Sequence, residues 1–279
     1  MSAALGVALV LVGALTACGT APAFESRGAP EGTLTVATPR EGLLVTAAEV
    51  DGVAVPLVLD LASAHAMTLT AEDAARVRAR ATGDTVRYWD ATGAPLEAPV
   101  YRVETLRWAG VTWRGVRAPG ARWSEGFAPP VRAGVLGLPL VRGLRVVLSV
   151  PDGVVRVLPS APCPEDSAPI ELDGGVIVRG ELDGEAVDVL IDTAATGDIA
   201  TTSARGGLHR LRLGGIDAGE VELTPLDLPE VPADVILGTP FLGQHRAVVI
   251  DLGSRCLFLE DAPDGEPERT LTQVAPGSP

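Results

Sequence analysis

The chain has 279 residues, a formal net charge of −14 and no lysine, so arginine supplies all 22 basic side chains. Nucleic acids and anionic lipid surfaces both attract basic proteins, and this acidic composition therefore argues against either as a partner. The chain is 47% hydrophobic but only 4% aromatic, which predicts a core of valine, leucine, alanine and isoleucine. Short apolar runs separated by glycine and proline favour a mostly β fold.

The N-terminus carries an apolar run, residues 5–15, that is too short to span a membrane. It ends in Leu15-Thr16-Ala17-Cys18, which resembles the signal of bacterial lipoproteins, whose cysteine becomes the lipidated first residue. A buried N-terminal helix is the alternative. We expect a signal peptide at 1–17, a flexible tether at 18–32, and an exported protein held in the bacterial cell envelope, at the outer membrane or periplasmic face, through Cys18.

An internal repeat organises the rest of the chain. The stretch 184–197, GEAVDVLIDTAATG, matches 52–63, GVAVPLVLDLAS, and in both an apolar run leads to one aspartate, Asp192 or Asp60. Further matching blocks follow in the same order: 42–45 with 175–178, 106–111 with 211–216, 135–140 with 236–241, and 145–148 with 246–249. A repeat of this length predicts two domain-sized copies, 33–159 and 169–260, joined by a linker at 160–168 and followed by a disordered tail at 261–279.

The first copy contains a segment that the second lacks. Asp60 and Leu106 are 46 positions apart, whereas Asp192 and Leu211 are 19 apart. The extra residues begin with a helix that starts after an N-cap at Thr70 and runs to about Arg80. A β-hairpin with its turn at 90–93 follows.

The two aspartates suggest a shared site. Alone, each could be a carboxylate in an ordinary strand-end turn, but related halves place them on a pseudo-twofold axis. Two adjacent carboxyls share one proton, so one can activate water as a base while the other acts as an acid. This chemistry uses no cofactor and no metal, and the three histidines lack metal-ligand spacing. No GxSxG motif of a serine hydrolase is present.

Two further cysteines, Cys163 in the linker and Cys256 in the last predicted strand, form a candidate disulfide. Such a bond suits an exported protein. Two unpaired thiols are the alternative.

The motifs resemble those of the retropepsin-like aspartic peptidases, through Asp192-Thr193-Ala194-Ala195 and through 235–238 followed by Phe241-Leu242. The resemblance implies two β-barrel lobes of the pepsin type, related by a pseudo-twofold axis, with a short helix and a flap hairpin in the first lobe. It implies Asp60 and Asp192 as the catalytic pair, Thr193 and Ser63 as supporting residues, and Tyr88, Trp89 and Gly93 in the flap. A peptide or protein is the implied substrate, and a monomer suffices because one chain supplies both halves.

Three residues depart from the family pattern. Leu61 replaces the hydroxyl residue that normally follows the first aspartate, and Ala62 and Ala194 replace glycines. The resemblance nevertheless implies an aspartic endopeptidase, which we expect to be sensitive to pepstatin and active at mildly acid pH. The alternative is a catalytically degenerate lipoprotein that binds peptides or serves as a scaffold.

Overall fold

A computed structural model describes residues 24–30, 33–36, 38–40, 42–89, 95–121, 133–203, 205–226, 231 and 233–260. The predicted signal peptide, Cys18, the flap residue Gly93 and the tail at 261–279 lie outside these ranges. Within the described part, no helix is long and apolar enough to cross a membrane.

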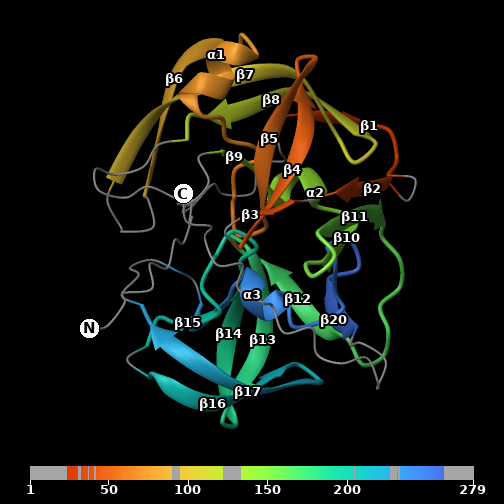
Figure 1. Ribbon diagram of the computed structural model, residues 1–279, viewed down its shortest axis with the longest axis vertical. Helices are drawn as coiled ribbons and strands as arrows, with labels where there is room; N and C mark the ends of the chain where they lie inside the picture. Colours follow the sequence, from red (N-terminus) through yellow and green to blue (C-terminus); the bar gives the residue numbers. More distant parts are fainter. Residues whose placement is uncertain are drawn as a thin grey trace, which may run out of the picture.

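The chain folds into two β lobes, the first drawn above the second in Figure 1. In the first lobe, a sheet runs in the order β1-β8-β7-β4-β5-β9, with β3 paired to β4 and β6 to β7. Its elements are β1 (Glu25–Arg27), β3 (Thr38–Arg40), β4 (Leu43–Val50), β5 (Val53–Asp60), α1 (Ala71–Arg76), β6 (Arg80–Trp89), β7 (Pro95–Trp108), β8 (Val111–Pro119), β9 (Gly134–Gly137) and α2 (Leu138–Val141).

The second lobe repeats this plan in a smaller form. The hairpin of β13 and β14 corresponds to that of β4 and β5, and β18 pairs in parallel with β14 as β9 does with β5. Its elements are β13 (Val176–Leu182), β14 (Glu185–Ile191), β15 (Ile199–Thr201), β16 (Gly207–Leu213), β17 (Ile216–Pro225), β18 (Val235–Leu237) and α3 (Thr239–Leu242).

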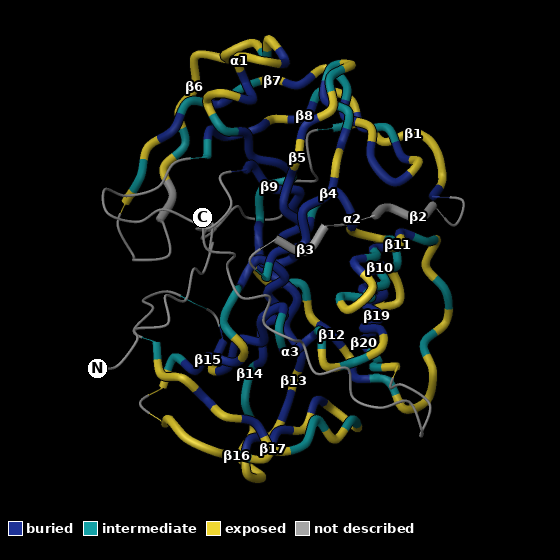
Figure 2. Tube along the Cα trace, viewed as in Figure 1, coloured by how far each residue is buried: buried dark blue, intermediate teal, exposed yellow. Residues whose placement is uncertain are grey.

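Strands from both halves pair between the lobes. The order is β12-β20-β19-β10-β11-β2, and the equivalent strands β10 and β19 pair antiparallel at its centre, with Val147 opposite Val249. These strands are β2 (Thr33–Val36), β10 (Leu144–Ser149), β11 (Val154–Pro159), β12 (Ala168–Leu172), β19 (Ala247–Asp251) and β20 (Cys256–Glu260). Figure 2 shows buried backbone running through both lobes and through the region where they meet. The predicted fold class, mostly β with two pepsin-type lobes, is confirmed.

The extra segment of the first lobe forms the predicted helix and hairpin. Thr70 caps α1, accepting a hydrogen bond of 3.0 Å from the backbone N–H of Asp73. The prediction of the helix end near Arg80 is wrong, because Arg78 adopts a left-handed φ of 56° and β6 already begins at Arg80. β6 and β7 then pair antiparallel as the predicted hairpin.

Two other predictions need correction. Part of the expected flexible tether forms a strand, because β1 pairs antiparallel with β8 at the edge of the sheet. The match of 42–45 with 175–178 is one residue out of register. Val45 lies opposite Val58 and Ile177 opposite Leu190, so 42–45 corresponds to 174–177. Adjacent glycines at 174 and 175 had allowed both alignments.

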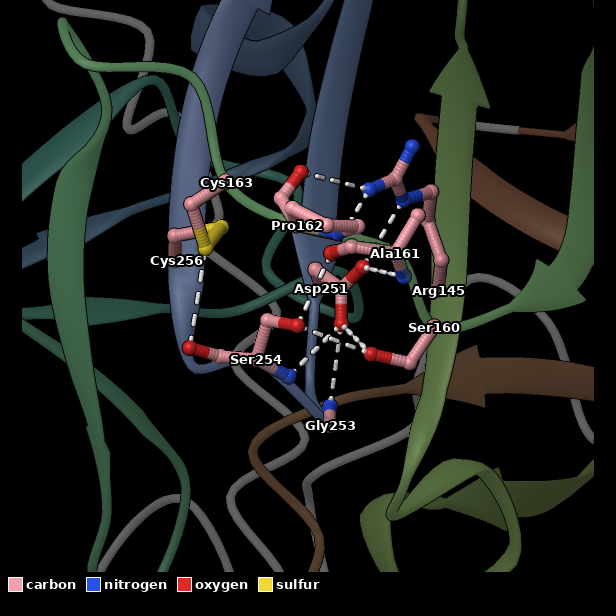
Figure 3. Close-up of polar contacts among 9 residues, drawn as sticks. All are labelled: Arg145, Ser160, Ala161, Pro162, Cys163, Asp251, Gly253, Ser254 and Cys256. Atoms are coloured by element: carbon pink, nitrogen blue, oxygen red, sulfur yellow. Dashed lines mark hydrogen bonds and ion pairs between the residues drawn. A yellow bond between two sulfur atoms is a disulfide. The ribbon is translucent and has the colours of Figure 1, made fainter.

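The linker between the lobes is held against β19 and β20 (Figure 3). Cys163 and Cys256 form a disulfide. Beside it, the fully buried carboxylate of Asp251 accepts hydrogen bonds from Arg145 Nε at 2.8 Å, Ser160 Oγ at 2.6 Å and the Ala161 N–H at 2.9 Å. Since Arg145 belongs to the first half and Asp251 to the second, this cluster ties both halves to the linker.

Two glycines allow the turns that follow the aspartates to pack closely. Gly137 is the last residue of β9, and Gly238 directly follows β18. A Cβ added to Gly137 would lie 1.9 Å from His65 O, and one added to Gly238 would lie 1.9 Å from Gly197 O. The neighbouring N–H groups reinforce the contact, because Leu138 donates to Ser63 O and Thr239 donates to Ala195 O. A side chain at either glycine must push the aspartate turn away.

Replacing Gly137 or Gly238 with alanine should therefore lower the free energy of unfolding by roughly 1–3 kcal/mol or more, as overpacking does. The measurement is denaturant unfolding at neutral pH. Gly215→Ala is the matched control, because its added Cβ meets nothing nearer than 3.9 Å. Equal stability of the three variants would contradict the close packing of these turns.

Candidate active site

Asp60 and Asp192 occupy equivalent positions at the ends of two central strands. Asp60 is the last residue of β5, and Asp192 directly follows β14 and donates its N–H to Leu237 O at 3.0 Å. Each strand lies beside a parallel neighbour, β9 or β18, and both aspartates are fully buried. The apolar runs thus form interior strands that deliver one carboxyl each to the region between the lobes.

The hydroxyl of Thr193 joins the two aspartate turns. Its Oγ1 donates a hydrogen bond of 2.7 Å to Leu59 O and accepts one of 3.0 Å from the Leu61 N–H. Leu59 and Leu61 are the residues on either side of Asp60, while Thr193 follows Asp192. One side chain from the second turn therefore holds the backbone on both sides of the first aspartate.

The first turn has no equivalent hydroxyl. Leu61 stands in the position of Thr193, and its fully buried side chain lies in the main hydrophobic core. Its backbone N–H still takes part in the bridge. In the second turn, Thr239 Oγ1 donates to Thr193 O at 3.0 Å, so the bridging residue is itself held in place. The role of Thr239 was missed in the sequence, although its place after the repeated glycine was a usable signal.

Each carboxylate is bonded on one oxygen. Asp60 Oδ1 accepts from the Ala62 N–H at 3.0 Å, and Asp192 Oδ1 accepts from the Ala194 N–H at 2.8 Å. The two Oδ2 atoms are buried, and no described residue hydrogen-bonds to them. Each carboxyl therefore has a matching oxygen that accepts no hydrogen bond from the described residues.

Burial shifts both carboxyls toward their protonated forms. Desolvation raises the pKa of Asp192 to about 7, against the opposing effect of the Ala194 and Ala195 N–H groups. Desolvation, and then repulsion from Asp192, hold the pKa of Asp60 well above its usual range. Two carboxyls in this setting titrate as a pair, and the pair keeps a proton at neutral pH.

The other predicted site residues have more modest placements. Ser63 is buried, and its Oγ lies 3.4 Å from His65 O. Its backbone N–H acts on the Asp60 carboxyl, whose pKa it lowers against the larger effect of burial. Tyr88 and Trp89 lie at the end of β6, opposite Leu96 and Pro95 of β7. Among the described residues, no group of three His, Cys, Asp or Glu is placed to hold a metal ion.

Comparison with solved structures places this arrangement among known folds. An aspartic proteinase from Irpex lacteus superposes with a TM-score of 0.56, and the match covers 86% of this chain and 97% of that one. The chain has the fold of an aspartic proteinase. At 13% identity, the likeness concerns the fold alone. No protein-family model matches the sequence, and no curated protein sequence matches it.

The buried pair should make stability depend on pH. Between the unfolded pKa of about 3.9 and the raised folded pKa values, the folded protein binds more protons than the unfolded chain. The free energy of unfolding should therefore fall as pH rises through this window, by up to about 1.4 kcal/mol per pH unit for each retained proton.

Asp60→Asn should reduce this slope, as measured by denaturant unfolding between pH 4 and pH 7, because it removes one of the two buried titrating groups. Asp173→Asn, which removes an exposed carboxyl outside the pair, controls for the change in net charge. An unchanged slope in Asp60→Asn would mean that Asp60 takes no part in retaining the proton.

Proposed function

We propose that this protein is an aspartic endopeptidase in which Asp60 and Asp192 hydrolyse peptide bonds. The observation that carries the proposal is the Thr193 bridge. It joins the turns of two buried carboxyls from equivalent strand ends, each with one oxygen bonded and the other without a hydrogen bond from the described residues. The likeness of the fold to an aspartic proteinase supports the same proposal.

The pair would act as a combined base and acid. The ionised carboxylate accepts a proton from water, whose oxygen attacks the carbonyl carbon, and the other carboxyl donates its proton to the carbonyl oxygen. The resulting tetrahedral intermediate breaks its C–N bond as a proton passes to the amide nitrogen. Carboxyl pairs that share one proton are the established feature of aspartic proteases.

The substrate in this proposal is an extended peptide or protein segment. The β6–β7 hairpin is the proposed flap, with Tyr88, Trp89 and Gly93 at or near its end. In the second lobe, the described residues between Asp192 and β16 form only the short strand β15. A single flap and two aspartates in one chain are consistent with a monomeric enzyme.

The alternative, a degenerate protease-like protein that binds peptides or acts as a scaffold, rests on Leu61, Ala62 and Ala194. It is no better supported than hydrolysis. Both alanines are buried in apolar clusters, and Leu61 keeps its backbone bond to Thr193. These departures leave the support of the carboxyl pair in place.

We also propose export and lipid anchoring at Cys18, on the basis of the sequence of the N-terminus. The Cys163–Cys256 disulfide accords with an oxidising compartment.

The purified protein should cleave an unfolded substrate such as casein, and pepstatin should inhibit it. Burial raises the pKa of Asp192 to about 7, so the pair reaches its singly protonated state nearer to neutral pH than the mildly acid range expected from sequence. Cleavage should therefore rise from acid pH toward neutral pH, in a profile measured from pH 3 to 9.

Asp60→Asn and Asp192→Asn should each remove this activity, whereas Asp173→Asn should keep it. All three variants should fold with the same circular dichroism spectrum. A folded protein that cleaves nothing across the whole pH range would leave the peptide-binding alternative ahead.

Lipid anchoring predicts that the full chain, expressed in a bacterial host with labelled palmitate, carries the label and partitions with membranes. Cys18→Ser should lose both properties. Cys256→Ser, which removes a cysteine of the described disulfide, is the control and should retain the label.

A further inference from the structure

The residues two positions after the aspartates are each buried in the opposite lobe. Ala62, from the turn of the first lobe, lies in a cluster with Ile177, Leu190 and Ile236 of the second. Ala194, from the turn of the second lobe, lies in a cluster with Val45, Val58 and other residues of the first. Their side chains are 3% and 0% exposed, so both methyl groups are enclosed.

The two clusters are equivalent under the repeat. Val45 pairs with Val58 in the β4–β5 hairpin as Ile177 pairs with Leu190 in the β13–β14 hairpin. A third member of each cluster also corresponds. Val135 lies two residues before Gly137, and Ile236 lies two residues before Gly238. Each lobe therefore offers the same apolar surface to the alanine of the other lobe.

The backbone of the second lobe accommodates this exchange. Gly175 lies against Ala62, and a Cβ added to it would lie 3.5 Å from Ala62 Cα and 2.5 Å from Leu190 Cδ1. A larger residue at 175 would therefore clash with Leu190, which belongs to the cluster around Ala62. The methyl groups of Ala62 and Ala194 are thus both enclosed by apolar side chains of the opposite lobe.

The same alanines also bond the carboxylates. The Ala62 N–H donates to Asp60 Oδ1 and the Ala194 N–H donates to Asp192 Oδ1. A shift of either alanine would therefore move the hydrogen-bond donor of a carboxylate as well as the spacing of the two turns. The packing of each alanine methyl group in the opposite lobe therefore affects the position of the N–H group that bonds a carboxylate.

We propose that Ala62 and Ala194 are positioning residues, whose exchanged methyl groups hold the two aspartate turns together and set the geometry of the carboxyl pair. In the first turn, Ala62 supplies across the lobes an apolar contact where the hydroxyl of a threonine at 61 is missing. The kinetic part of this inference rests on the proposed peptidase function, whereas the geometric part does not.

The test replaces each alanine with glycine, the residue of the family pattern, in the full chain. Selective ¹³C labelling of aspartate carboxyls allows Asp60 and Asp192 to be titrated by NMR without any substrate, with the Asp→Asn variants giving the assignments. Ala62→Gly and Ala194→Gly should loosen the turns and admit water. The pKa of both carboxyls, raised by burial, should then fall toward the usual aspartate range.

If the unaltered protein cleaves casein, the same variants should lose roughly ten- to a hundredfold in kcat, with little change in KM, because small displacements of catalytic groups slow chemistry. The acid limb of the pH profile should move to lower pH with the carboxyl titration. An unaltered protein without activity would reject the proposed function, while the titration would still test the positioning role.

Ala48→Gly is the matched control, because Ala48 is 2% exposed within a strand of the first lobe and belongs to the main core. It should lower stability but keep the carboxyl titration. If a glycine variant at the turns does not fold, Val45→Ala and Ile177→Val replace it, because they shorten side chains that pack against Ala194 and Ala62. These variants should also lower the pKa of the carboxyls.

Two results would overturn the inference. One is that Ala62→Gly and Ala194→Gly lose only as much stability as Ala48→Gly and keep the carboxyl titration of the unaltered protein. The other is that return to glycine increases kcat, which would mean that the alanines hinder the pair.

Discussion

The hydroxyl of Thr193 is the interaction on which the arrangement of the carboxyl pair depends. It is a single buried group, yet it donates to the carbonyl before Asp60 and accepts from the N–H after it. A hydroxyl can do both because it carries one donor and two acceptor sites. The bridge satisfies two backbone groups at a buried turn, where unpaired groups would be costly. It therefore holds the turn of Asp192 against the turn of Asp60 through the backbone.

The two halves support their turns by different means. The second half supplies two hydroxyls: Thr193 Oγ1 bonds the backbone on both sides of Asp60, and Thr239 Oγ1 bonds Thr193 O in the second turn. The equivalent positions in the first half are Leu61 and Leu138, both buried in the main core. Both threonines of the second half thus correspond to leucines in the first half. The two hydroxyls act through separate contacts, because Thr239 Oγ1 bonds the backbone carbonyl of Thr193 and not its side chain.

Much of this architecture follows from the repeat in the sequence. Strand ends at Asp60 and Asp192, the N-cap at Thr70 and the β6–β7 hairpin depend on local patterns of apolar, capping and turn residues. What could not be predicted depends on contacts distant in sequence. The left-handed conformation that ends α1 at Arg78, and the pairing of β1 with β8, leave no periodic signal. In the sequence, Ala62 and Ala194 appeared only as departures from the family pattern, because the residues that they contact lie in the other lobe.

A buried carboxyl pair also places a demand on the rest of the protein. Above the raised pKa values the pair carries charge in an apolar interior, which opposes folding. Separation of the lobes would relieve this repulsion by hydrating both carboxyls. Two contacts join the halves elsewhere, namely the β10–β19 pairing and the Arg145–Asp251 ion pair, and the disulfide fixes the linker to β20. The two buried aspartates can therefore stay close together only because other contacts hold the two halves of the protein together.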